Sequence, residues 1–142
     1  KEDYAFAAAK EQPFKGLWKQ PKEGLVVFDQ IAQKGSLLDS DYTYNVDQMK
    51  GKIFTLAPIE DGWAVIGRSD KYLGGCTYTI DTCSKKQLVL TLDESGPVVV
   101  YHASGTPSAS EGTVTEMGDG FYQIDLPNDD ANHQLTLTLS GK

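Results

Sequence analysis

The stretch of residues 87–101 constrains the fold of this chain more than any other part of its sequence. Leucine occupies positions 88, 90 and 92, which is the two-residue period of a strand with one buried face. The turn formers at positions 93–96 follow, and a β-branched run that ends in Tyr101 completes the stretch. The pattern predicts a β-hairpin, and a hairpin is stable in water only when its apolar face packs against further strands.

Further short segments with strand character follow one another at intervals of roughly 8 to 15 residues, separated by turn residues. One pair, residues 53–59 and 63–67, flanks Asp61-Gly62, a dipeptide that supplies a residue with positive φ to a tight turn. The sequence lacks the amphipathic helices that parallel α/β folds need as crossovers. We therefore expect an all-β fold, an antiparallel β-sandwich of about eight strands.

The first 24 residues have a different character. Residues 4–12 favour a short helix, whereas Pro13, Gly16, Pro21 and Gly24 interrupt any longer element. We interpret residues 1–24 as a short irregular or helical N-terminal connection and residues 25–142 as the β-sandwich domain.

Composition excludes several classes of partner. The 142 residues carry a formal net charge of -7 and one arginine, Arg68, so no arginine-based grip on phosphate exists and no nucleic-acid partner is expected. No run approaches the roughly 18 consecutive apolar residues of a membrane-spanning helix, so no membrane insertion is expected.

Two segments carry a family resemblance: residues 56–72, LAPIEDGWAVIGRSDKY, and residues 119–127, DGFYQIDLP. They resemble the C-terminal β-sandwich domains of secreted bacterial glycoside hydrolases, and the nearest are proteins similar to the α-galactosidase and raffinose synthase family. In that family the catalytic aspartates lie on a preceding (β/α)8 barrel, so none is transferred to a position here. The resemblance implies an accessory domain of a parent glycoside hydrolase, with the preceding catalytic domain as its partner and an extracellular or periplasmic location.

Candidate chemical groups are few. His102 and His133 lie at the ends of expected strands without a recognisable nucleophile and orienting group, so we expect no catalytic residue and no enzymatic activity of this chain alone. Cys76 and Cys83 have neither zinc-site nor redox-motif spacing. They form either a local disulfide, if the chain is extracellular, or two reduced thiols.

Clusters of oxygen ligands at residues 39–47 and 125–132 suggest a metal. Asp125, Asn128, Asp129 and Asp130 lie close together around an expected turn. Such a cluster suits calcium, although it does not match the twelve-residue calcium loop, and solvated turn residues are the alternative. No other cofactor is expected.

Aromatic side chains would carry any glycan contact, because a flat ring stacks on a pyranose face. Tyr72, Trp18 and Tyr78 are the candidates, with ordinary packing as the alternative, whereas Trp63 is expected in the core.

The sequence and the resemblance leave two function classes for this chain. The first is a noncatalytic β-sandwich domain of a secreted carbohydrate-active enzyme that supports the catalytic domain or contacts glycan, and the alternative is a free-standing extracellular binding or adhesion module.

Overall fold

The computed structural model describes residues 2–6, 23–38, 42–46, 53–70, 78–129 and 133–139. These ranges contain thirteen strands, every pairing is antiparallel, and they hold no helix that could cross a membrane. The strands are β1 (Glu2–Phe6), β2 (Leu25–Asp29), β3 (Lys34–Leu38), β4 (Tyr42–Val46), β5 (Phe54–Pro58), β6 (Trp63–Arg68), β7 (Tyr78–Cys83), β8 (Gln87–Leu92), β9 (Ser95–His102), β10 (Pro107–Ala109), β11 (Thr113–Gly118), β12 (Phe121–Asp129) and β13 (His133–Leu139). The all-β prediction is confirmed.

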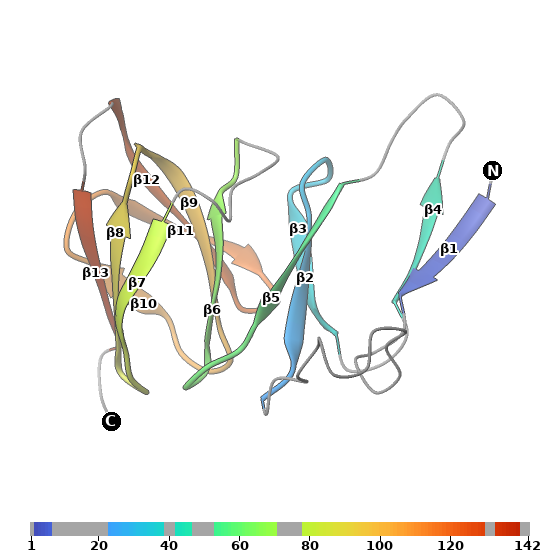
Figure 1. Ribbon diagram of the computed structural model, residues 1–142, viewed down its shortest axis with the longest axis horizontal. Helices are drawn as coiled ribbons and strands as arrows, with labels where there is room; N and C mark the ends of the chain where they lie inside the picture. The colour runs from blue at the N-terminus through green and yellow to red at the C-terminus, as the bar shows by residue number, and fades with distance from the viewer. Residues whose placement is uncertain are drawn as a thin grey trace.

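Two four-stranded sheets form a sandwich, with strand orders β10-β13-β8-β7 and β11-β12-β9-β6 (Figure 1). On β8, Leu88, Leu90 and Leu92 are 0%, 0% and 1% exposed and pack into the core between the sheets. Leu135 and Leu137 of the neighbouring β13 face the same core, as their alternation with threonine predicts. The expected sandwich of about eight strands is therefore present, and the inward face of β8 is confirmed.

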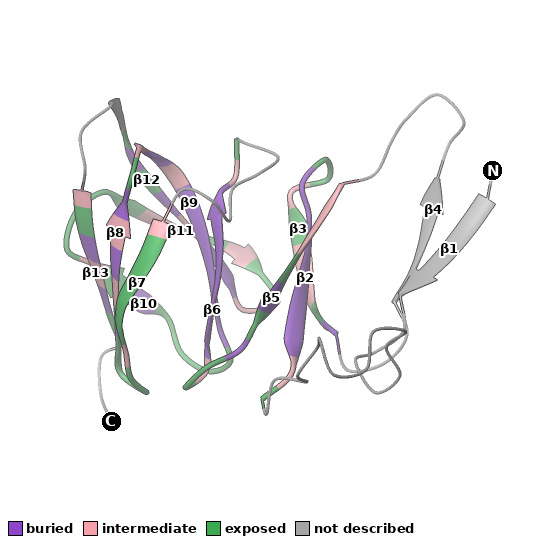
Figure 2. Cartoon of the chain, in the orientation of Figure 1, coloured by how far each residue is buried: buried purple, intermediate pink, exposed green. Residues whose placement is uncertain are grey.

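A third sheet, β3-β2-β5, covers the far face of the β11-β12-β9-β6 sheet (Figure 1). Val98 and Val100 of β9 enter the first core, whereas Val99 and Tyr101 enter a second core together with Phe28 of β2. The β11-β12-β9-β6 sheet is thus the middle of three layers. Cover on both faces explains why Figure 2 shows β6 buried along its whole length and β9 buried everywhere except at Pro97.

Close approach between the outer and middle layers depends on Gly35 of β3. A Cβ atom at this position would lie 2.4 Å from Cζ of Phe121, which belongs to the second core. Glycine therefore lets β3 pack directly against the Phe121 ring.

The predicted hairpin over residues 87–101 is wrong. β8 pairs with β7 and β13, whereas β9 pairs with β12 and β6, so the two strands lie in opposite sheets. The short connection crosses from one layer to the other, which lets both strands place apolar side chains in the same core. Arg68 holds this corner, because its Nη1 donates a hydrogen bond to the carbonyl oxygen of Ser95 at 3.0 Å.

The predicted tight turn at Asp61-Gly62 is confirmed, with φ values of 50° and 86°. A bridge between Glu60 and Trp63 closes the turn, after which β5 joins the outer sheet and β6 joins the middle sheet. The carboxylate of Glu23 accepts hydrogen bonds from the backbone amides of Asp61 at 2.6 Å and Gly62 at 3.0 Å, so it fixes the turn from outside.

The expected short helix at residues 4–12 is wrong where the structure describes that segment. Residues 2–6 form β1, which pairs with β4 in a two-stranded sheet, with Tyr4 opposite Tyr44. Long-range strand pairing here overrides the helix propensity of the alanines, because intrinsic propensity is a weak prior. Residues 7–22 lie outside the described ranges, and the boundary after residue 24 stays a prediction.

Candidate functional site

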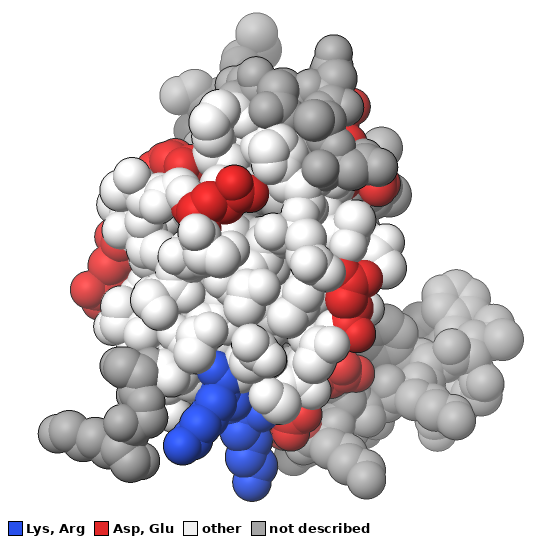
Figure 3. Space-filling model, turned by 90° about the vertical axis from the view of Figure 1, so that its left-hand side faces the viewer, with Lys and Arg blue, Asp and Glu red and all other residues white. Residues whose placement is uncertain are grey.

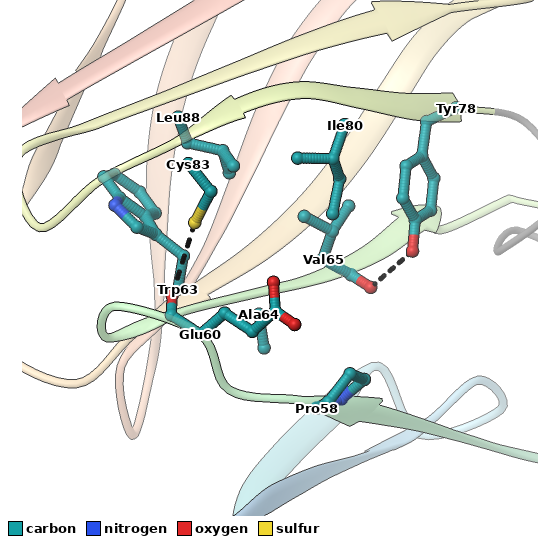
Figure 4. Close-up of a pocket in the computed structure, with 9 residues that line it drawn as sticks. All are labelled: Pro58, Glu60, Trp63, Ala64, Val65, Tyr78, Ile80, Cys83 and Leu88. Atoms are coloured by element: carbon teal, nitrogen blue, oxygen red, sulfur yellow. Dashed lines mark hydrogen bonds between the residues drawn. The ribbon is translucent and has the colours of Figure 1, made fainter. Parts of the chain in front are cut away.

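A pocket lies where the sandwich is open, between β6 at the edge of one sheet and β7 at the edge of the other (Figure 4). Its volume is about 110 Å³. The apolar part of its wall consists of Pro58, Trp63, Ala64, Val65, Ile80 and Leu88. Glu60, Tyr78 and Cys83 supply the polar groups. The pocket exists because edge strands of different sheets are held together by side chains rather than by a backbone ladder.

Three hydrogen bonds cross this open edge. The hydroxyl of Tyr78 donates to the carbonyl oxygen of Val65 at 3.1 Å, and Nε1 of Trp63 donates to the carbonyl oxygen of Ser84 at 2.8 Å. Sγ of Cys83 lies 3.4 Å from the carbonyl oxygen of Glu60 and donates to it. Figure 4 shows Tyr78 at one end of the pocket and Trp63 with Cys83 at the other, so these bonds fix both ends.

The electrostatic environment of the pocket is negative. Burial raises the pKa of the Cys83 thiol above its ordinary value, and the negative charges of Asp61, Glu60 and Glu23 raise it further. Cys83 therefore stays protonated at neutral pH, and a thiol in this state is a poor nucleophile and a poor metal ligand. The pocket is suited to binding rather than to covalent chemistry at the sulfur.

His102 packs against Trp63, which forms part of the pocket wall. Its ring lies 4.5 Å from the Trp63 ring in an edge-on arrangement, and its Nδ1 accepts a hydrogen bond from the backbone amide of Ser104 at 3.0 Å. Burial lowers the pKa of His102 more than the nearby backbone groups of Ser104 and Lys85 raise it. His102 is therefore a buried, neutral imidazole that packs on a core tryptophan.

Arg68 and His133 are engaged elsewhere. Arg68 is buried and forms a two-point ion pair with Asp70, at 2.8 Å through Nε and 2.6 Å through Nη2, which raises the arginine pKa. Nδ1 of His133 lies 3.1 Å from Oε1 of Glu111 at the molecular surface. The lone arginine therefore links two segments of the fold and does not present its guanidinium for ligand recognition.

The structure describes only some of the candidate residues identified from the sequence. Tyr78 lines the pocket, whereas Tyr72 and Trp18 lie outside the described residues. Cys83 carries a free thiol, and the proposed disulfide stays a prediction because Cys76 falls in an undescribed range.

The acidic cluster is described only in part. Asp125 is exposed on β12 and accepts a hydrogen bond from Nε2 of Gln123 at 2.8 Å. The backbones of Asn128 and Asp129 continue β12, and Asp130 lies outside the described residues. Within the described ranges, no three histidine, cysteine or acidic side chains gather as a metal site would require, and calcium stays a prediction.

Glu60 and Cys83 were not identified as neighbours from the sequence. The sequence relates Cys83 only to Cys76, either as a local disulfide or as two reduced thiols, and 23 positions separate Glu60 from Cys83 along the chain. Glu60 and Cys83 become neighbours because β6 and β7 lie at adjacent edges of different sheets, and no local sequence pattern predicts which sheet each strand joins. Comparison of the chain with protein-family models and with curated proteins found no match.

Proposed function

We propose that this chain is a noncatalytic β-sandwich domain of a secreted carbohydrate-active enzyme, where it supports the catalytic domain or contacts glycan. The resemblance of residues 56–72 and 119–127 to the C-terminal domains of α-galactosidase-like glycoside hydrolases motivates this proposal. The alternative is a free-standing extracellular binding or adhesion module.

The outward face of the β10-β13-β8-β7 sheet is the observation that carries the proposal. Figure 3 views this side of the molecule and shows a broad surface that is mostly uncharged, with acidic groups in its upper part and at its margins and basic groups at its lower end. The strand registers place Thr136 opposite Val89 and Gln134 opposite Thr91, and these side chains point away from the leucine core. The Asp81 carboxylate lies beside Thr91 and accepts a hydrogen bond from its hydroxyl, whereas Thr136 and Gln134 contribute hydroxyl and amide groups. Hydroxyl, amide and carboxylate groups side by side suit a neutral polar partner such as glycan or the surface of a neighbouring domain.

The size of the pocket also favours a supporting role. Ligand pockets of enzymes commonly enclose roughly 300 to 1,000 Å³. At about 110 Å³, the pocket between β6 and β7 is too small to enclose a sugar ring with its surrounding water. This pocket therefore does not enclose a sugar, and the proposed contact is made through the open face.

A titration with neutral oligosaccharides tests glycan contact. We expect α-galactosyl and other neutral oligosaccharides to shift the backbone amide resonances of β8 and β13 in a saturable manner. Thr136→Glu, which replaces a hydroxyl of this face by a larger charged group, should weaken this binding, and Thr115→Glu on β11 at the far edge of the middle sheet is the matched control. Shifts that are absent, or that are unchanged by Thr136→Glu, would rule out glycan contact through this face.

The gene that encodes the chain distinguishes the two function classes. Several hundred upstream residues with βα repeats would support an accessory domain of a glycoside hydrolase. A signal peptide joined directly to Lys1 would instead favour the free-standing module.

A further inference from the structure

We propose that the pocket between β6 and β7 binds an alkylammonium group, either a small free amine or the side chain of a lysine from another protein. The apolar wall would hold the methylene stem, and the carboxylate of Glu60 would face the cation. This site is independent of the proposed glycan contact, which involves the outward face of a sheet.

The shape of the pocket limits the ligand to a slender group. A cavity of roughly 150 Å³ lined by apolar side chains holds a benzene molecule. The pocket here, at about 110 Å³, accommodates a short aliphatic chain instead. Val65, Ile80 and Leu88 contribute the apolar contacts along its length.

The charge of the ligand follows from the position of Glu60. Figure 4 shows the Glu60 side chain extending into the space between Cys83 at one end of the pocket and Tyr78 at the other. Glu60 is exposed, and no ion pair joins it to Lys85 or Lys86 on the neighbouring turn, as far as the described residues show. A carboxylate in this position attracts a cation and leaves its second oxygen in contact with water.

Two further observations agree with a cationic ligand. The negative charges of Asp61, Glu60 and Glu23 act on the Cys83 thiol and raise its pKa, so their field reaches the interior of the pocket. Trp63 and Tyr78 contribute aromatic rings to the wall, and aromatic rings attract ammonium groups. An anionic ligand would meet unfavourable charge, and a neutral one would leave the Glu60 carboxylate unpaired.

The test is a nuclear magnetic resonance titration of the 142-residue chain with n-butylammonium chloride, observed at the backbone amides of Val65 and Cys83. We expect saturable shifts with a dissociation constant on the order of millimolar, because a ligand of about five heavy atoms makes few contacts. 1-Butanol, which has the same stem without the charge, should bind more weakly. Equal binding of butanol and butylammonium, or no saturable shift from butylammonium, would overturn the proposal.

Two variants locate the site. Glu60→Gln should weaken butylammonium binding about two- to fivefold, the range expected for a partly exposed ion pair. Glu116→Gln, an exposed carboxylate on β11 at the opposite edge of the middle sheet, should leave it unchanged. Cys83→Met fills the pocket and should abolish binding in a chain whose amide spectrum shows that it is folded. An affinity that is the same in all three variants refutes this site.

A pair of peptides identifies the source of the ammonium group. Acetyl-Gly-Lys-Gly-amide should shift the same resonances as butylammonium if the natural ligand is a lysine side chain, and the norleucine peptide is its neutral control. Binding of butylammonium without binding of the lysine peptide assigns the pocket to a small free amine.

Discussion

The substitution Leu90→Ala should destabilise the domain severely. Leu90 is 0% exposed and lies in the core between the two four-stranded sheets, where it pairs with Leu135 of β13 and Ile80 of β7 in the strand register. Truncation of a fully buried leucine removes its transfer free energy and leaves a cavity, at a combined cost of about 2.7 to 5 kcal/mol. Typical domains have unfolding free energies of roughly 5 to 15 kcal/mol, so this loss is a large fraction of the total.

Thr91→Ala is the matched control, because Thr91 is the next residue on the same strand and faces outward. Its side chain is half-buried, and its Oγ1 donates a hydrogen bond to Oδ2 of Asp81 at 2.5 Å on the exposed surface. Loss of a solvent-exposed hydrogen bond of this kind costs about 1 kcal/mol or less.

Chemical denaturation in urea, followed by circular dichroism and by tryptophan fluorescence, measures both variants. We expect Leu90→Ala to lower the midpoint by an amount that corresponds to the cost above, without a change in the slope of the transition. If Leu90→Ala is harmless while Thr91→Ala unfolds the domain, the register of β8 is wrong by one residue and every assignment of an inward face on that strand must be inverted.

Three further predictions concern packing and ionisation. Gly35→Ala should destabilise the chain by about 1 to 3 kcal/mol in urea denaturation, because the new Cβ atom meets the Phe121 ring. Adding Phe121→Leu to the Gly35→Ala chain should recover part of this loss. If the destabilisations of the two single variants simply add in the double variant, the contact between the two positions is refuted. The lowered pKa of His102 means that the unfolded chain binds the proton more readily, so its contribution to stability is complete above the ordinary value of 6.5 and declines as the pH falls below it. The native chain should therefore lose more unfolding free energy than His102→Gln between pH 7.5 and pH 5.5, and parallel losses would contradict this. Burial and three carboxylates raise the pKa of the Cys83 thiol, so in a Cys76→Ser chain at pH 8 iodoacetamide should modify Cys83 more slowly than it modifies the cysteine of an unstructured peptide. Unfolding the chain in urea should remove this difference. Equal rates for the folded chain and the peptide would refute a raised pKa at Cys83.

Local patterns predicted the features that depend on neighbouring residues. Alternation of leucine with threonine and valine identified the inward faces of β8 and β13, because the two-residue period is a property of each strand alone. Asp61-Gly62 identified its turn for the same reason, since positive φ depends on the residues that adopt it.

Features that depend on the choice of partner strand could not be predicted in this way. Two polar residues between β8 and β9 are compatible with a hairpin and with a crossing between sheets, and the alternatives differ only in contacts with β7, β13, β12 and β6. The apolar run in β9 indicates that both faces of this strand are buried, but it does not predict which strands cover the second face. The pocket has the same origin, because Glu60 and Cys83 become neighbours only when β6 and β7 form adjacent edges of different sheets.

The position of β9 in the middle sheet has a consequence for how the molecule opens. β9 is paired on both sides, with β12 and β6, and its side chains enter both cores, so its amides meet solvent only when all three layers separate. Hydrogen exchange at Val99 and Val100 should therefore require global unfolding. Exchange on β7, which is an edge strand of its sheet among the described residues, should require only local fluctuation. The wall of the pocket that β7 provides can then widen to admit a ligand while the middle sheet stays closed.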